Sequence, residues 1–198
     1  EGPDTIAAFF GEPVMGAGGV IVPPATYWDK IQAVLRKYDI LLVADEVICG
    51  FGRTGKMFGC ETYGIKPDVL VVSKQITSSY FPFSAIIMND RMFEPIADES
   101  NKIGVLGHGF TAGGHPVGSA IALENLKIIE ERGLVAHAAE LGGYMQGKLR
   151  ELTSHPLVGE VRGVGMIAAL ELVLDKGRKT AAATPGAVGG MASRMLQE

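Results

Sequence analysis

The sequence predicts an α/β fold built on a mixed, mostly parallel sheet. Short apolar runs alternate with helical patterns as far as Gly133, which is typical of strands joined by crossover helices. Two of these runs, Leu41–Ala44 and Val69–Val72, contain no polar residue, as expected for strands buried on both faces. The alternation ends after Gly133. We therefore expect residues 1–133 to belong to a large domain and residues 134–198 to begin a smaller α+β domain.

The part of the chain before Gly133 is expected to supply the sheet. A helix is predicted after Pro23-Pro24, because Trp28, Ile31 and Tyr38 recur on one face of a helical pattern. Glycine-rich stretches are predicted to be loops. Strands are predicted at Ile6–Phe10, Leu41–Asp45, Val69–Lys74 and Phe83–Met88, the helix at Tyr27–Tyr38, and loops at Gly16–Gly19, Gly50–Gly64 and Asp98–Gly114.

The remaining elements are expected to be two helices and one strand. Pro116 fits the first turn of a helix, and Gly133 stops that helix. Apolar residues at helical spacing predict a second helix, which Ser154-His155-Pro156 breaks. Helices are predicted at Pro116–Arg132 and about 138–152, a strand at Val164–Leu174 with a bulge formed by Gly163 and Gly165, a loop at Asp175–Gly190, and the start of a helix at Met191–Leu196.

Composition and charge argue against several classes of partner. The chain has 198 residues, a net charge of −4 and a pI near 5.6, with no basic run, so nucleic acid is not expected to bind. No apolar run approaches the ~18 residues of a membrane span. Cys49 and Cys60 are too few for a disulfide framework and predict buried thiols in a reducing cytoplasm. The chain begins at Glu1 without Met and ends inside an incipient helix at Glu198, so we expect a longer polypeptide.

Two charged residues close two of the predicted strands. Asp45 ends one apolar run and Lys74 ends the next. Ligands of open α/β sheets bind beyond the carboxyl ends of the strands, so an amine and a carboxylate are expected at one site. Pyridoxal phosphate (PLP) needs this pair, because a lysine holds it as a Schiff base and an acid sits on its ring nitrogen. Taken singly, Lys74 would be a strand-end residue reaching solvent and Asp45 a turn cap.

A glycine motif offers an alternative from another functional class. Gly50–Gly55 fits the dinucleotide pattern, but no strand ends directly before it and no helix is expected directly after it. With Lys56 the motif nearly fits a phosphate loop, but Met57 stands where Ser or Thr must bind magnesium. A nucleotide-binding module remains the alternative reading.

Metal and hydrolase sites are not expected. No Gly-x-Ser-x-Gly elbow exists, which disfavours an α/β-hydrolase. The histidines, which share no metal-ligand spacing, are His108, His115, His137 and His155.

Several motifs, in order, resemble the class III PLP-dependent aminotransferases. The likeness covers the chain to about Asp175. One departure is Gln75, where a glycine usually follows the lysine; glutamine is seen in an ω-amino-acid-type subgroup. The matching segments are Gly11–Gly19, Asp45–Gly55, Lys66–Asp68, Ser73–Tyr80, His108–Pro116 and Val161–Gly165.

The resemblance implies a role for five residues. Lys74 matches the Schiff-base lysine and Asp45 the acid on the pyridine nitrogen. Val47 matches the residue that packs on the pyridine ring. Thr111 matches the residue that donates to the cofactor phosphate of the neighbouring subunit, which implies a homodimer with shared sites. Glu12 matches a substrate-proximal carboxylate that can pair with a movable arginine.

The family resemblance also implies a reaction and a fold. We expect the large domain of PLP fold type I and ping-pong transfer of an amino group from an amine or ω-amino acid to a keto acid such as pyruvate. An aminomutase or decarboxylase on the same scaffold and a non-catalytic fragment remain alternatives. The family places its phosphate cup and ring-stacking aromatic before the segment that matches Gly11, and a substrate-carboxylate arginine after the one that matches Arg162.

Overall fold

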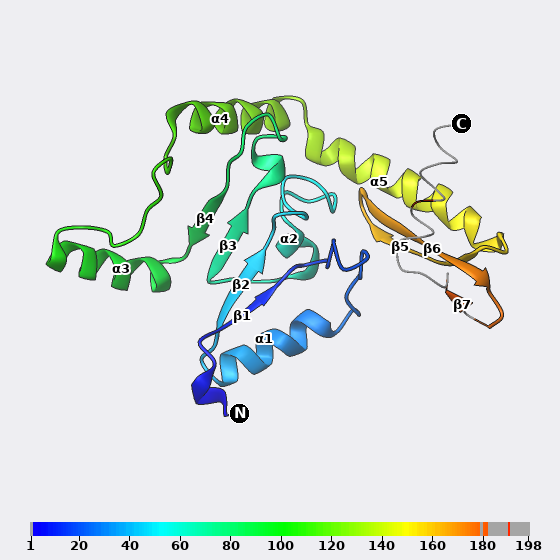
Figure 1. The fold of residues 1–198 in the computed structure, drawn as a ribbon, viewed down its shortest axis with the longest axis horizontal. Helices are drawn as coiled ribbons and strands as arrows, with labels where there is room; N and C mark the ends of the chain where they lie inside the picture. The colour runs from blue at the N-terminus through cyan, green and yellow to red at the C-terminus, as the bar shows by residue number, and fades with distance from the viewer. Residues whose placement is uncertain (1, 179, 182–189, 191–198) are drawn as a thin grey trace.

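A four-stranded sheet forms the centre of the structure, a computed structural model that describes residues 2–178, 180, 181 and 190. The strand order is β1-β2-β3-β4. The first three strands are parallel and the fourth is antiparallel, which confirms the mostly parallel α/β sheet (Figure 1). The bounds are β1 Ala8–Gly11, β2 Leu41–Asp45, β3 Val69–Val72 and β4 Ala85–Met88, with a short 3₁₀ turn η1 at Pro3–Thr5.

The helix α1 (Tyr27–Lys37) connects β1 to β2 and packs on the sheet, as predicted. Its buried residues include Trp28 and Leu35, which join Leu42 and Ala44 of β2 in one hydrophobic cluster. Tyr38 was expected on the same face but is 44% exposed. The helix ends at Lys37, so Tyr38 lies at the C-cap and outside the buried stripe.

The connection from β2 to β3 contains a helix that the sequence did not predict. Residues 50–64 were expected to be a loop, but α2 spans Gly59–Tyr63. The cause is a distant side chain: the Glu46 carboxylate accepts hydrogen bonds from the backbone N–H groups of Gly59 (2.9 Å) and Cys60 (2.6 Å). Such a cap cannot be read from local propensity, because it comes from outside the helix.

The predicted strand at Val69–Lys74 is shorter than expected. Strand β3 ends at Val72, and Lys74–Ile76 forms the 3₁₀ turn η2. Lys74 has a φ of 44°. A left-handed residue cannot continue a strand, so the chain turns away at Lys74.

The predicted loop Asp98–Gly114 is wrong in its first part. Helix α3 spans Asp90–Ile103 and contains Pro95. Asn89 caps the helix by accepting from the Met92 N–H at 3.2 Å, and Gly104 ends it with a φ of 79°. Apolar residues recur at helical spacing in α3 at Phe93, Ile96 and Ile103, but no residue of this helix is buried (Figure 1, left).

The two predicted helices after residue 115 are confirmed. Helix α4 spans Pro116–Glu131 and α5 spans Leu134–Glu151, followed by the 3₁₀ turn η3 at Leu152–Ser154. Gly133 separates α4 from α5 with a φ of 59°, a conformation that favours glycine.

A β-hairpin replaces the single strand predicted at Val164–Leu174. Strands β5 (Val158–Val164) and β6 (Ile167–Asp175) pair antiparallel, and β7 (Thr180–Ala181) pairs with β6. Gly165 turns the chain with a φ of 54°, so the two glycines that predicted a bulge mark a hairpin instead. The predicted helix at residues 191–196 and most of the predicted loop at residues 175–190 lie outside the described residues.

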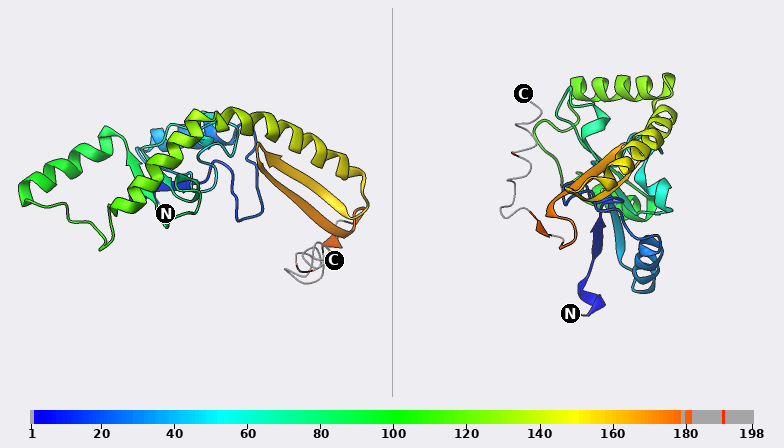
Figure 2. Two further views of the ribbon diagram at one scale, coloured as in Figure 1. Left: turned by 90° about the horizontal axis from the view of Figure 1, so that it is seen from above. Right: turned by 90° about the vertical axis from the view of Figure 1, so that its right-hand side faces the viewer.

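The hairpin turn packs at backbone distance on α5 and on the glycine loop that follows β2. A Cβ atom at Gly142 would meet the Gly165 backbone carbon at 2.7 Å. The buried Gln146 side chain donates to the carbonyl of Gly165 at 3.0 Å, and Met166 N–H donates to the Arg53 carbonyl at 2.8 Å. The hairpin runs along α5 in both views of Figure 2. We call this contact the glycine junction.

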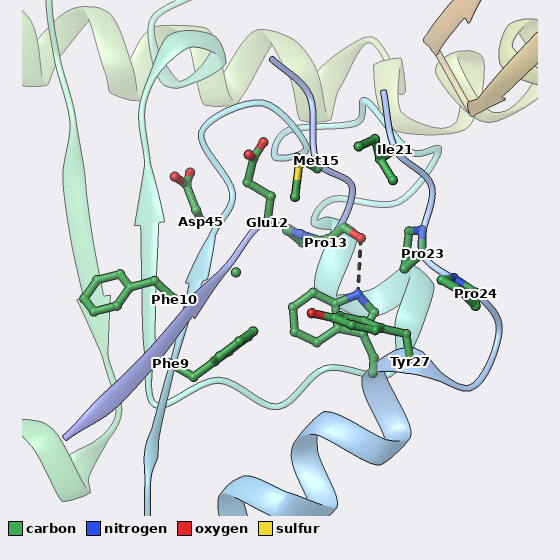
Figure 3. A pocket seen from close by; sticks show the side chains of 12 residues that line it. Phe9, Phe10, Glu12, Pro13, Met15, Ile21, Pro23, Pro24, Tyr27 and Asp45 are labelled. Atoms are coloured by element: carbon green, nitrogen blue, oxygen red, sulfur yellow. Dashed lines mark hydrogen bonds between the residues drawn. The ribbon is translucent and has the colours of Figure 1, made fainter. Parts of the chain in front are cut away.

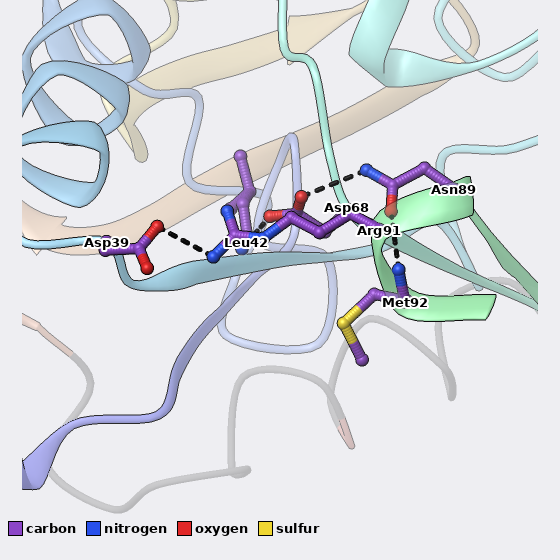
Figure 4. A network of polar contacts seen from close by, with 6 residues as sticks. All are labelled: Asp39, Leu42, Asp68, Asn89, Arg91 and Met92. Atoms are coloured by element: carbon purple, nitrogen blue, oxygen red, sulfur yellow. Dashed lines mark hydrogen bonds and ion pairs between the residues drawn. The ribbon is translucent and has the colours of Figure 1, made fainter. Parts of the chain in front are cut away.

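A polar network closes the amino edge of the sheet (Figure 4). Asp68 accepts from the Leu42 N–H at 2.9 Å and from the Asn89 side chain at 3.0 Å. Arg91 forms an ion pair with Asp39 at 2.7 Å. The network joins the start of β2, the start of β3 and the N-terminus of α3. Across the described part of the chain, each helix is too short or too polar to cross a bilayer.

Candidate active site

Three of the residues predicted at the site lie at the carboxyl edge of the sheet. Gly11 pairs with Ala44 and Asp45 with Val71, so the parallel strands end at nearly the same level. Glu12 follows β1, Asp45 is the last residue of β2, and Lys74 follows the end of β3. The register therefore brings two carboxylates and an amine to one edge, where open α/β sheets bind ligands.

Glu12 and Asp45 line a cavity of about 540 Å³. Most other lining residues are apolar, and the aromatic ones are Phe9, Phe10, Tyr27 and Trp28. Figure 3 shows both carboxylates pointing to the same side, away from the rings of Phe9 and Tyr27. The Trp28 indole N–H donates to the Pro13 carbonyl at 3.2 Å, which fixes one wall. A mostly apolar cavity with a few polar groups is the usual form of a small-molecule site.

Asp45 is half-buried and held by its own turn. One carboxylate oxygen, Oδ1, accepts from the Val47 backbone N–H at 3.0 Å. The turn cap considered for Asp45 therefore exists, but it uses one of the two oxygens. The same hydrogen bond directly links the residue predicted to hold the ring nitrogen, Asp45, to the one predicted to pack on the ring face, Val47.

Lys74 is exposed and has a left-handed backbone. That conformation costs a non-glycine residue roughly 1–2 kcal/mol, and such strain concentrates at functional positions. The segment after Lys74 is firmly held: Asn125 of α4 donates to the Gln75 carbonyl at 2.7 Å, and the buried Thr77 hydroxyl donates to the Phe81 carbonyl at 2.6 Å. Lys74 therefore extends from a braced turn.

Glu46 is a buried acid beside the site whose structural role the sequence did not indicate. Its side chain is fully buried, and burial raises the pKa of its carboxyl group against the lowering effect of the Cys60 and Gly59 hydrogen bonds. Its backbone N–H donates to the Val71 carbonyl at 2.9 Å. Glu46 thus joins β2, β3 and α2 directly beside Asp45. The sequence signal for Glu46 was an acidic residue after an apolar run, but that signal was assigned only to Asp45.

The Glu46 cap also bears on the nucleotide alternative. The N-terminus of a helix binds phosphate through its free N–H groups. At α2 the first of these groups are already bonded to Glu46. The preceding glycine loop is also bonded within the protein: Phe51 N–H donates to the Met57 carbonyl at 2.6 Å, and the Arg53 carbonyl accepts from Met166 N–H at 2.8 Å. The Gly50–Gly55 motif is therefore a packing element in this structure.

Thr111 is not brought to the other site residues within this chain. It is exposed in the segment between α3 and α4, and it is not among the residues that line the cavity. Its predicted contact with the phosphate of a neighbouring subunit remains a prediction.

The cysteines and histidines form no further reactive centre among the described residues. No group of three or more His, Cys, Asp and Glu side chains has metal-binding geometry within that part of the chain. Cys49 and Cys60 are free and buried, as predicted. Burial raises the pKa of the Cys49 thiol to about 12 and raises that of Cys60 as well, so both stay protonated at neutral pH.

Comparison with known proteins identifies the family. The profile of the class III aminotransferases matches residues 1–194. A diaminobutyrate–2-oxoglutarate transaminase of Halomonas elongata is 56% identical over 176 residues, 88% of this chain and 38% of the relative. A gamma aminobutyrate transaminase 3 of Solanum lycopersicum is 52% identical over 89% of this chain and 34% of the relative.

Solved structures agree with this assignment. A transaminase with L-ala is 67% identical, with a TM-score of 0.96, over 99% of this chain and 46% of that one. The omega transaminase of Pseudomonas jessenii in complex with PMP is 61% identical, with a TM-score of 0.95, over 99% of this chain and 44% of that one. The chain spans less than half the length of these relatives. The predicted fold and the predicted resemblance are both confirmed, and the chain belongs to the class III aminotransferase family.

Proposed function

We propose that the protein carrying this chain is a PLP-dependent aminotransferase. It would take an amino group from an amine or ω-amino acid and give it to a keto acid such as pyruvate in a ping-pong reaction. The observation that carries this proposal is the strand register, which presents Asp45 and Lys74 at one edge of the sheet. The family match adds support, as do the diaminobutyrate and gamma aminobutyrate named for two relatives and the PMP bound to a third.

The residues at the carboxyl edge fit PLP by their chemistry. When bound, the cofactor supplies a carbonyl carbon for the donor nitrogen and a ring that delocalises the electron pair left on the donor carbon. The pair of groups it requires is an amine and a carboxylate. Asp45 ends β2, and Lys74 lies in the turn that follows the adjacent strand β3. The half-buried, tethered position of Asp45 suits a group that must hold one orientation.

Each residue has a separate task in this proposal. Asp45 keeps a proton on the ring nitrogen through a charge-assisted hydrogen bond. Lys74 would hold the cofactor through its amine and, once that amine is free, would take a proton from or return one to the donor Cα. Val47 packs on the ring face. Glu12 faces the substrate from the end of β1.

A reduction experiment tests the proposal. The purified holoenzyme should show a visible absorption band that borohydride bleaches, and peptide mapping should then find the reduced cofactor on Lys74. Addition of an amine donor alone should shift the band and release one carbonyl product per site. A protein without such a band, or with the label on another lysine, would contradict the assignment. An adduct without carbonyl release from any amine donor would favour a mutase or a decarboxylase.

The proposal includes a homodimer with shared sites and a cytoplasmic location. Apolar side chains around Thr111 support the dimer: Phe110 is 80% exposed, and Leu106 and Val117 are also exposed. The free, buried cysteines support a reducing compartment. Cell fractionation tests the location.

Complementation tests the shared site. A Lys74→Ala chain combined with a Thr111→Ala chain would place both lesions in one site and leave the other site whole. Mixed dimers should therefore regain activity that neither parent has. Mixed dimers that form but stay inactive would exclude a contribution of Thr111 to the partner's site.

A further inference from the structure

Arg162 links the hairpin to a loop next to the cavity, across 143 positions of sequence. Its Nε donates to the Gly19 carbonyl at 2.6 Å. Its Nη1 pairs with Glu160 and its Nη2 with Glu171, both at 2.9 Å. The Arg162 side chain is 21% exposed, so these charges are partly shielded from water. All three guanidinium nitrogens are engaged, and the side chain has one defined orientation.

The loop that Arg162 holds is a closed turn. Gly19 N–H donates to the Gly16 carbonyl at 3.0 Å. Met15 and Ile21 pair across the base of the turn. Gly19 has a φ of 116°, and a Cβ atom there would lie 3.2 Å from Nη2 of Arg162, so the close approach needs glycine. Gly19 and Gly16 are therefore linked directly through the hydrogen bonds of this turn, and a displacement of Gly19 is expected to displace Gly16.

The far end of the same turn holds Glu12. Gly16 N–H donates to Glu12 Oε2 at 2.9 Å. This bond fixes one oxygen of the carboxylate that lines the cavity beside Asp45. A continuous path of hydrogen bonds and backbone thus runs from Arg162 through Gly19 and Gly16 to Glu12.

We propose that Arg162 is a positioning residue that sets substrate selectivity by fixing Glu12 at the cavity; this inference rests on the proposed function. A fixed carboxylate at the cavity repels a substrate carboxylate and tolerates a neutral or cationic group in its place. Donors that carry a distal carboxylate are therefore penalised while Glu12 is held. Release of the turn lets Glu12 move and weakens that penalty.

The purely structural alternative makes a different prediction. The ion pairs of Arg162 lie within the hairpin, so their loss would lower stability wherever the substrate binds. That effect would not discriminate between donors and would not depend on Glu12. A double-mutant cycle between Arg162 and Glu12 separates the two roles.

The test uses the PLP-loaded holoenzyme with Arg162→Gln, Glu12→Gln and the double variant. Equilibrium binding of butanoate, an unreactive carboxylate, is read from the cofactor absorption. The ratio of kcat/KM for n-butylamine to that for 4-aminobutanoate is measured beside it. We expect Arg162→Gln to tighten butanoate binding and to lower that ratio, each by at least about threefold, a usual size for coupled neighbours. Neither change should recur when Glu12 is already Gln.

Matched controls keep the outcome clear. Arg178→Gln removes the same charge from the far end of the hairpin, where Arg178 is 86% exposed and pairs with Asp175; it should change neither quantity. Glu171→Gln retains the bond from Arg162 to Gly19 and removes one brace, so a smaller change in the same direction is expected even where Arg162→Gln folds poorly.

Two results would overturn the inference. One is unchanged butanoate binding and donor ratio in a folded Arg162→Gln enzyme, or in Glu171→Gln if that is the variant that folds. The other is an equal effect with and without Glu12. A wild-type enzyme that lacks the reducible band on Lys74 would instead refute the proposed function itself.

Discussion

The two edges of the sheet use the same residue type in opposite ways. At the amino edge, both carboxylate oxygens of Asp68 accept hydrogen bonds from the protein, and the backbone N–H of Asp68 is bonded to Leu42 as well. At the carboxyl edge, Asp45 accepts from Val47 through one oxygen. Within the described residues, both oxygens of Asp68 are bonded, whereas Asp45 has one bonded oxygen. This difference in internal hydrogen bonding, more than the residue type, is what suits Asp45 to the proposed cofactor site.

Among the substitutions at the carboxyl edge, Lys74→Ala should cause the largest loss of activity. The variant loses both the anchor and the proton carrier, so transamination should fall by at least about 10³-fold. The cofactor should then wash out on dialysis and leave no reduced label on the chain. A matched change, Lys56→Ala in the glycine loop, should leave the rate unchanged. A labelled Lys74→Ala protein would contradict the assignment.

Asp45→Asn should give the second largest effect. Asparagine can still accept from Val47, so the melting temperature should stay within about a degree or two, as for substitutions that break no internal contact. A charge-assisted hydrogen bond is worth about 1.5–3 kcal/mol, so turnover should fall roughly 10- to 100-fold. Near-normal turnover would mean that Asp45 is only a turn cap.

Asp68→Asn is the mirror experiment at the amino edge. The amide would face a donor, either Leu42 N–H or the Asn89 side chain, and leave it without an acceptor. We expect unfolding in urea to lose about 1–2 kcal/mol, with turnover per folded molecule unchanged. A loss of turnover without a loss of stability would mean that Asp68 serves the reaction and not the fold, which would contradict the proposed difference between the two edges.

Glu46→Gln should lower stability at every pH, because the amide would leave either Gly59 N–H or Cys60 N–H without an acceptor. The smallest of the expected effects is the one on the pH dependence of stability. Burial raises the pKa of Glu46 above its ordinary value of 4.5, so the folded protein holds this proton more tightly than the unfolded chain. The resulting stabilisation is present below pH 4.5 and is lost as the pH rises through the raised folded pKa. Glutamine does not titrate. The wild type should therefore lose stability relative to Glu46→Gln over that range, whereas parallel curves would refute the assignment of the shift.

The strands of the sheet, and the charged residues that flank them, were the most predictable parts of this chain. The uninterrupted apolar runs of β2 and β3 each favour a strand of a sheet, and a charge that ends such a run is visible without a structure. The positions of Asp45 and Lys74 at one edge follow from those two facts. The expected burial holds for the middle of β2, whereas in β3 only Val72 is buried. The turn at Lys74 was not predictable, because a left-handed lysine has no propensity signal and depends on contacts from Asn125 in a distant helix.

The sequence did not predict helices α2 and α3, for two different physical reasons. Helix α2 depends on Glu46, whose carboxylate lies 13 positions before the first N–H that it caps. Helix α3 has a local cap in Asn89 and apolar residues at helical spacing, but Pro95 in its interior weakens the helical signal. The hairpin was read as one strand because Gly163 and Gly165 fit either a bulge or a turn, and only the packing of Gly165 against Arg53 decides between them.

The glycine junction limits which substitutions this sequence can accept during evolution. A side chain at Gly142 would collide with the backbone of Gly165, and one at Gly165 would lie 2.5 Å from the Arg53 carbonyl oxygen, so neither position can change alone. Gly143 and Gly147 lie on the same helix, and no described residue comes within 4 Å of a Cβ added at either position. Alanine at those two sites would favour the helix by about 0.5–1 kcal/mol. Adjacent positions of α5 thus differ: a neighbour in the hairpin constrains Gly142, and no described residue places such a constraint on Gly143.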